Sequence, residues 1–148
     1  MFKQILVSTD GSKLSKKAIK VATRLAKTTG ASLTGVYVIA PYVAPAYGEG
    51  FLYASYVTSR RYKEITGREA KKALAEVEIS AESNGIKYRS ATVAAADPWQ
   101  GIIRAARGKH CDLIVMASHG RRGLSGLMLG SETTKVLTHT KIPVLVCR

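Results

Sequence analysis

Residues 112–131, D-L-I-V-M-A-S-H-G-R-R-G-L-S-G-L-M-L-G-S, decide how the rest of the chain is interpreted. The apolar run L-I-V-M-A at 113–117 is typical of a strand that is buried on both faces of a parallel sheet. A glycine-rich loop follows, and Ser131 is expected to be the N-cap of a helix whose inward face consists of Val136, Leu137 and the methyl group of Thr133. The free N–H groups at the start of this helix then lie at the carboxyl edge of the sheet, an arrangement that suits a phosphate group.

Two common phosphate-binding motifs are absent from the sequence. No Gly-Lys-Ser or Gly-Lys-Thr triplet occurs, which excludes a Walker A loop, and no G-x-G-x-x-G follows the first strand, which excludes the dinucleotide fingerprint. Instead, Ala117 and Gly120 are followed, after nine residues, by Gly130 and Ser131. This spacing resembles the nucleotide-binding signature of the universal stress protein family, G-x-x-G-x9-G-[ST], with Ala117 in place of the first glycine. Alanine is the smallest replacement, so it hinders close backbone approach only slightly.

The other apolar runs and turn residues predict alternating strands and helices. Strands are expected at 5–7, 32–39, 88–93, 113–117 and 144–147, and helices at 12–28, 60–84, 97–108 and from 131 onward. The inward face of the first helix is expected to contain Leu14, Ala18, Val21, Ala22 and Leu25. This alternation requires a parallel sheet with helices on both faces, so we predict one doubly wound α/β domain that spans residues 1–148.

The order of the five strands follows from the resemblance, which implies the Rossmann-like order 3-2-1-4-5. In this order the topological switch point lies between the first and fourth strands. Asp10, directly after the first strand, is then expected to meet the loop between Ala117 and Gly130 in one crevice. Two segments that are far apart in the sequence therefore converge on one predicted site.

The resemblance implies nucleotide contacts from three parts of this crevice. Asp10 matches an aspartate that contacts the nucleotide in the family, although a turn or helix-cap aspartate is the alternative. Val38 matches the position whose backbone reads the adenine. Gly130 is expected to admit a phosphate beside the helix N-terminus and to permit a positive φ. The expected contact residues are Ser8, Thr9, Asp10, Val38, Met116, Ala117, His119, Gly120, Arg121, Arg122, Gly130, Ser131 and Glu132.

Three further side chains, like Asp10, have a second interpretation. His119 either approaches a nucleotide phosphate or orders the loop. Arg121 and Arg122 are placed where guanidinium groups reach a triphosphate, or else they are solvated loop arginines. The implied ligand is ATP, with ADP and AMP as alternatives, and with or without Mg²⁺. The histidines and cysteines show no metal-ligand spacing of their own.

The segment 40–59 is unusual because it holds two prolines and four tyrosines but one charge. A loop of this length inside a compact domain is often functional. Its aromatic side chains either cover an adenine, form a partner surface or pack on their own domain.

The sequence gives little support for catalysis. Ser118 lacks the G-x-S-x-G elbow of serine hydrolases, and neither a lysine clamp nor a defined base for phosphoryl transfer is visible. We therefore predict a nucleotide-dependent regulatory or binding module of the stress response. The alternative is a slow ATPase or nucleotidyl transferase of the same superfold.

Composition predicts the surroundings and the assembly of the protein. Cys111 and Cys147 form no C-x-x-C motif, and the early apolar run ends at Asp10, so we expect reduced thiols in a cytoplasmic protein without a membrane span. The last strand, 144–147, is short, apolar and at the sheet edge, which favours a homodimer through this strand; family members commonly pair in this way.

The chain is strongly basic, with 23 Lys and Arg against 10 Asp and Glu and a formal net charge of +13. A field of this sign attracts ATP and other polyanions. No RNA-binding signature or recognition-helix pattern accompanies the charge. We therefore expect non-specific polyanion affinity at low salt, and a dedicated nucleic-acid-binding protein is the third and weakest interpretation.

Overall fold

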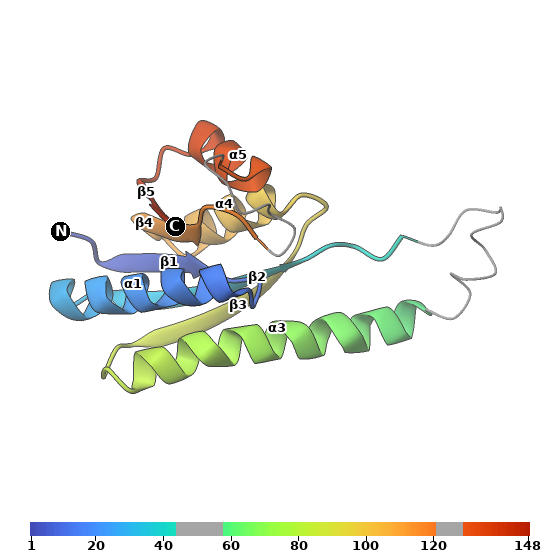
Figure 1. Ribbon diagram of the computed structural model, residues 1–148, viewed down its shortest axis with the longest axis horizontal. Coiled ribbons are helices and arrows are strands. Elements are labelled where there is room, and N and C mark those ends of the chain that lie inside the picture. Colours follow the sequence, from blue (N-terminus) through green and yellow to red (C-terminus); the bar gives the residue numbers. More distant parts are fainter. Residues whose placement is uncertain (44–57, 121–128) are drawn as a thin grey trace.

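The computed structural model describes residues 1–43, 58–120 and 129–148, along which strands and helices alternate (Figure 1). The strands are β1 (Gln4–Ser8), β2 (Ser32–Ile39), β3 (Tyr88–Ala94), β4 (Leu113–Ala117) and β5 (Val144–Cys147). The helices are α1 (Lys13–Thr29), α3 (Ser59–Glu82), α4 (Pro98–Gly108) and α5 (Ser131–His139). The predicted bounds of β2, β4 and β5 are confirmed. None of the helices in these three ranges offers an apolar stretch long enough to cross a bilayer.

All five strands pair in parallel in the order β3-β2-β1-β4-β5, which confirms the predicted fold class and strand order. The central strand β1 pairs on one side with β2, up to Ser8 opposite Val36, and on the other with β4, up to Val7 opposite Val115. The carboxyl ends of β1 and β4 are therefore neighbours at one edge of the sheet. This is the switch point at which doubly wound sheets bind ligands.

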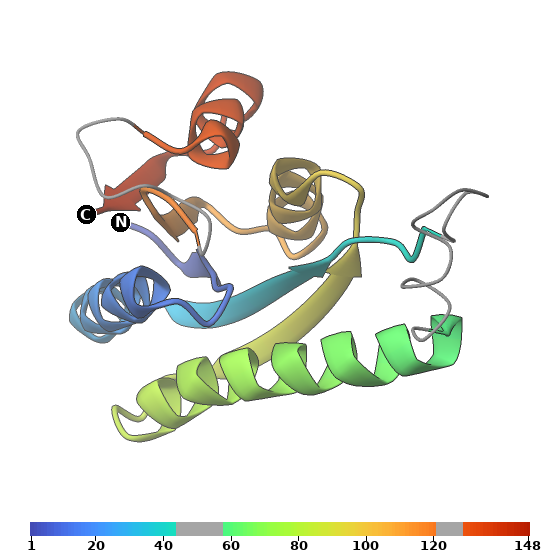
Figure 2. The ribbon, with the colours of Figure 1, turned by 45° about the vertical axis from the view of Figure 1, so that its right-hand side comes forward.

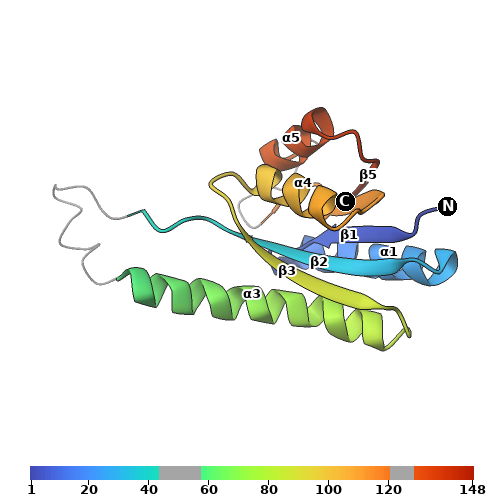
Figure 3. The same cartoon turned by 180° about the vertical axis from the view of Figure 1, so that it is seen from behind.

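Helices cover both faces of the sheet in two layers (Figures 1 and 2). Helices α1 and α3 lie on one face, and α4 and α5 lie on the other. Seen from behind, α3 runs along β2 and β3 (Figure 3). The layers match the right-handed crossovers that parallel strands require.

The core contains three apolar clusters, and the two larger ones lie on opposite faces of the sheet. Ile5 and Val7 of β1 belong to the cluster under α1 and α3, whereas Leu6 between them belongs to the cluster under α4 and α5. All three are fully buried. Burying such a side chain contributes roughly 1.5–3 kcal/mol, so an apolar run without alternation is what a central parallel strand needs.

Helix α1 has the predicted termini but a different inward face. The side chain of Ser12 caps the helix by accepting a hydrogen bond from Ser15 N, and Gly30 ends it with φ of 72°. The expectation that Val21 faces inward is wrong, because 38% of Val21 is exposed and Ile19 is buried in its place. The buried face contains the small residues Ala18, Ala22 and Ala26, which allow the helix axis to approach the sheet closely.

Helix α5 differs from the prediction at its start and on its inward face. Gly130, not Ser131, is the N-cap residue, and Ser131 is the first helical residue. Leu137, expected inside, is 40% exposed. Only one narrow row of this short helix, Thr133 and Val136, is buried, because α5 packs over the edge of the sheet, next to α4.

Candidate functional site

The turn between β1 and α1 builds one wall of the predicted site. The backbone N–H of buried Thr9 donates to Val36 O over 3.0 Å, which ties the end of β1 to β2. The hydroxyl of Thr9 donates to Ser15 Oγ over 3.2 Å and accepts from Gly11 N over 3.2 Å. Gly11 has φ of 77°, a left-handed conformation in which glycine is favoured. The turn is therefore tied by hydrogen bonds to β2 and to α1.

Asp10 lies in this turn and has the turn-forming role that we considered as the alternative to ligand contact. Its Oδ1 accepts a hydrogen bond from Ser12 N over 2.9 Å. The other carboxylate oxygen faces the end of β4, since a Cβ added to Gly120 would lie 2.8 Å from Asp10 Oδ2. Glycine at 120 thus allows the chain after β4 to pass against the carboxylate. The predicted convergence of Asp10 with the glycine-rich loop is present in the structure.

The far end of the glycine-rich loop returns to β4 through Gly130. Its N–H donates to Ser118 O over 2.8 Å. A Cβ on Gly130 would lie 3.0 Å from Ser118 O and 3.2 Å from His119 Cα. Gly130 does not use the positive φ that glycine permits, because its φ is −62°. Glycine is needed here for close backbone packing, and the Gly130 N–H is bonded to Ser118 O and is not available to a ligand.

Thr133 completes this closure. Its predicted inward position is confirmed, but its hydroxyl contact with the chain after β4 was not predicted. Thr133 is 1% exposed, and its hydroxyl lies 3.0 Å from both Ala117 O and Ser118 O. The first turn of α5 is therefore hydrogen-bonded to the last residue of β4 and to the residue that follows it. A threonine in the first turn of a helix after a buried strand is a signal for this contact, although the signal is weak.

Ser118 and His119 form a polar pair directly after β4. Ser118 Oγ lies 3.1 Å from His119 Nδ1, and Ser118 is buried while His119 is half-buried. The hydroxyl–imidazole contact orders the start of the loop, which is the second of the two interpretations considered for His119. It leaves Nε2 as the ring atom that can face a ligand.

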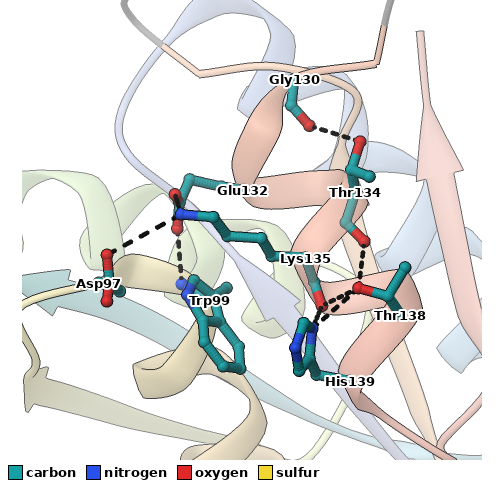
Figure 4. A network of polar contacts seen from close by, with 8 residues as sticks. All are labelled: Asp97, Trp99, Gly130, Glu132, Thr134, Lys135, Thr138 and His139. Atoms are coloured by element: carbon teal, nitrogen blue, oxygen red, sulfur yellow. Dashed lines mark hydrogen bonds and ion pairs between the residues drawn. The ribbon is translucent and has the colours of Figure 1, made fainter.

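Glu132 connects α5 to α4 (Figure 4). Its Oε2 accepts a hydrogen bond from Trp99 N over 2.8 Å, and its Oε1 lies 3.4 Å from Lys135 Nζ. Asp97 occupies the N-cap position of α4, but its side chain makes no capping hydrogen bond. Glu132 therefore supplies from α5 the acceptor that the start of α4 lacks. This contact turns the carboxylate toward α4.

The remaining predicted residues of the site lie at the strand ends. Ser8 and Ala117, both half-buried, end β1 and β4, while Met116 is buried among the residues under α4 and α5. The side chain of Val38 packs on α4, because a Cβ on Gly101 would lie 2.8 Å from both of its methyl groups. Ligand contact from Met116 or Val38 is thereby limited to the backbone.

The predictions for the two loop arginines, the tyrosine-rich segment and a metal ion concern groups that the contacts above do not include. Arg121, Arg122 and most of the tyrosine-rich segment 40–59 lie outside the described residues. Within the described ranges, no three His, Cys, Asp or Glu side chains are grouped so that they could hold a metal ion. A bound Mg²⁺ would therefore need ligands from the nucleotide or from elsewhere in the chain.

Both cysteines are free and buried. Burial is the main cause that raises the pKa of the Cys111 thiol, and burial also raises the pKa of the Cys147 thiol. A thiol of raised pKa is a poor nucleophile at neutral pH. Cysteine-based catalysis is thus disfavoured, although Cys147 pairs with Ala117 beside the site.

Comparison with known proteins identifies the family. The model of the universal stress protein family matches residues 1–148. Universal stress protein MJ0531 of Methanocaldococcus jannaschii is 33% identical over all of this chain and 83% of its own length. Among solved structures, MJ0577 of the same organism is 26% identical with a TM-score of 0.80, covering 99% of this chain and 96% of its own. A universal stress protein in complex with cAMP, 23% identical with a TM-score of 0.70, covers 99% and 97% and shares the fold. The chain belongs to the universal stress protein family.

Proposed function

We propose that this protein binds an adenine nucleotide, ATP in the first instance, at the carboxyl edge of β1 and β4 and acts as a nucleotide-dependent regulatory module in the cytoplasm during stress. The observation that carries the proposal is the packing of Gly120 against Asp10 and of Gly130 against Ser118. The signature glycines lie where a side chain would collide with the turn or the strand end. A relative of the same fold is in complex with cAMP, which supports an adenine nucleotide as the ligand class.

In this proposal the described residues share the work of holding the nucleotide. The carboxylate of Asp10 accepts hydrogen bonds from the ribose or the base. The backbone at Val38 and Met116 reads the adenine, and the backbone after Gly120 and the first turn of α5 face the phosphates. Arg121 and Arg122 remain predicted phosphate contacts, and ADP and AMP remain alternatives to ATP.

The first experiment identifies the ligand directly. The purified protein is denatured, and any released nucleotide is identified by mass spectrometry. Calorimetric titration with ATP, ADP, AMP and adenosine at about 150 mM salt then ranks the affinities, because screening at this ionic strength suppresses long-range attraction. Absence of a nucleotide and of measurable binding would remove the proposal. ATP turnover that one loop substitution abolishes would instead indicate an enzyme.

The second experiment separates a built site from a merely basic surface. Asp10→Asn retains an acceptor for Ser12 N but removes the charge, so a purely electrostatic surface predicts tighter ATP binding. We expect weaker binding. Asp112→Asn is the matched control, because Asp112 also accepts backbone hydrogen bonds, from Lys3 N and Gln4 N, at the opposite edge of the sheet. Tighter ATP binding by Asp10→Asn would contradict the role of the carboxylate.

The proposed assembly is a homodimer through β5. This strand ends the sheet, and Leu145 within it is 38% exposed. Pairing of two such edges would cover Leu145 and satisfy the free ladder of backbone groups. Sedimentation at micromolar concentration should give the mass of two chains, whereas the mass of one chain would contradict the proposal.

A further inference from the structure

Helix α1 concentrates positive charge more than any other described helix does. Its sequence, K-L-S-K-K-A-I-K-V-A-T-R-L-A-K-T-T, contains six basic residues and no acidic residue. Helix α3 in contrast mixes six basic residues with five glutamates. The charge of α1 is therefore not balanced within the helix, and it contributes a large share of the net charge of +13.

Four of these six basic side chains form a line on the outside of α1. Two others reach α3 or the turn after it, since Lys16 Nζ lies 2.8 Å from Glu76 Oε1 and Lys27 Nζ donates to Asn84 Oδ1 over 3.3 Å. The remaining four, which we call the basic stripe, are exposed: Lys13, Lys17, Lys20 and Arg24. With about 3.6 residues per turn they fall within roughly 60° around the helix axis and extend over about 16 Å.

The surface beside the basic stripe is mixed, with one further cation and the apolar residues Val21, Leu145, Val146 and Cys147. Lys17 and Lys20 line a shallow hollow between α1 and β5 together with Val21, Leu145 and Arg148. Arg148 adds a fifth cation on the side of β5. Positive charge thus extends from α1 toward the sheet edge.

The chemistry of the basic stripe selects among three classes of polyanionic partner. A protein interface needs an apolar core and is depleted of lysine there, whereas the stripe is charged along its length. A membrane-bound helix inserts its apolar face, but the apolar face of α1 is buried against the sheet. Interfaces with nucleic acid are much more positive than protein interfaces, and phosphates contact Lys and Arg without further apolar support.

We propose that the basic stripe binds the phosphate backbone of double-stranded nucleic acid without sequence preference. The stripe contains no aromatic side chain on which bases of a single strand would stack. Neighbouring cations at spacings of three and four residues lie about 5–6 Å apart, so successive side chains reach different phosphates. The basic stripe starts at Lys13, next to the β1–α1 turn, and its other three cations extend along α1 away from the proposed nucleotide site at the carboxyl edge of the sheet.

The number of cations sets the expected salt dependence. Each neutralised phosphate contributes about −0.9 to the slope of log K against log salt, so four contacts give a slope of about −3.6. Affinity for a duplex should then fall about 150-fold between 50 and 200 mM salt. A triple substitution that leaves one contact should reduce this fall to about 3- to 4-fold.

The test measures binding to a fluorescent 20-base-pair DNA duplex at several salt concentrations. The stripe variant carries Lys17→Gln, Lys20→Gln and Arg24→Gln. The control variant carries Arg68→Gln, Lys71→Gln and Lys72→Gln on the exposed face of α3, which removes the same number of lysines and arginines. Circular dichroism and thermal melting confirm that both variants fold.

We expect the stripe variant to have a slope about 2.7 units shallower and the control variant to keep the wild-type slope. A duplex of RNA should bind with a similar slope, because both duplexes present phosphates. Equal changes of the salt-dependence slope in the two variants would show that net charge alone attracts DNA and would overturn the proposal. Tighter binding to phosphatidylserine vesicles than to the duplex at equal salt would overturn it in favour of a lipid surface.

Discussion

Removal of the Glu132 carboxylate should destabilise the protein more than removal of the Asp97 carboxylate, although Asp97 occupies the N-cap position of α4. In the structure Glu132 Oε2 accepts the bond from Trp99 N over 2.8 Å, and Asp97 makes no side-chain cap. Loss of a capping acceptor typically costs about 1 kcal/mol. Asp97 has one described ion pair, 4.0 Å from Lys135 Nζ with both side chains nearly half exposed, and such pairs contribute about 0–1 kcal/mol.

The expected losses in the free energy of unfolding are therefore about 1 kcal/mol or more for Glu132→Ala and less than about 0.5 kcal/mol for Asp97→Ala. For a domain of this size 1 kcal/mol corresponds to about 2–4 °C in Tm. Glu132→Gln keeps an acceptor and should lie between Glu132→Ala and the wild type. The three variants therefore form a graded series.

Urea unfolding provides the assay, with two probes. The fluorescence of Trp99, the single tryptophan of the chain, reports on the junction of α4 and α5, and far-UV circular dichroism reports on the whole fold. Coincident transitions permit the two variants to be compared as free energies. If Asp97→Ala is at least as destabilising as Glu132→Ala, the assignment of the cap to α5 is refuted.

Two further predictions follow from the close contacts and the titration of buried groups. Gly130→Ala places a Cβ 3.0 Å from Ser118 O, so it should cost about 1–3 kcal/mol and weaken ATP binding; unchanged melting and affinity would contradict the packing argument. Burial first, and then Glu78, raise the pKa of Tyr88 from 10.0 to about 12 in the folded protein. Folding thus favours the neutral phenol. Its contribution to the free energy of unfolding is complete below pH 10 and should be lost as the pH rises toward 12. Tyr88→Phe should lose less stability than the wild type over this interval in denaturant titrations, and an equal loss would refute the prediction.

The fold was predictable because its signals are local in the sequence. An unbroken apolar run such as 113–117 indicates a strand buried on two faces, and the structure divides these side chains between two core clusters. The cap at Ser12 and the left-handed glycine at 30 depend on neighbouring residues alone, and they end α1 close to the predicted bounds of 12–28. The strand order needed the resemblance to a family, since alternation of strands and helices does not determine it.

The rotation of the helices was less predictable, since a helical pattern shows apolar spacing without showing how closely each residue approaches the sheet. In α1 the small residues Ala18, Ala22 and Ala26 lie against the sheet, and Val21 is displaced to the surface. In α5 the buried row contains Thr133, which a hydropathy pattern ranks below Leu137. Apolar spacing alone therefore did not show that Val21 and Leu137 are exposed.

The two described signature glycines show why the details of the site require coordinates. Both match one sequence pattern, but they have different close neighbours. A side chain at 120 would collide with the Asp10 carboxylate, whereas one at 130 would collide with the backbone at Ser118. The first contact joins β4 to β1 across the switch point, and the second joins α5 back to β4. Neither needs a positive φ, so the pattern records two long-range close approaches and not a local turn. Since the Gly130 N–H is bonded to Ser118 O, a phosphate at the proposed site would need other donors, from the α5 N-terminus or from the loop. In this proposal the two glycines shape the backbone around the site, and other groups hold the phosphate.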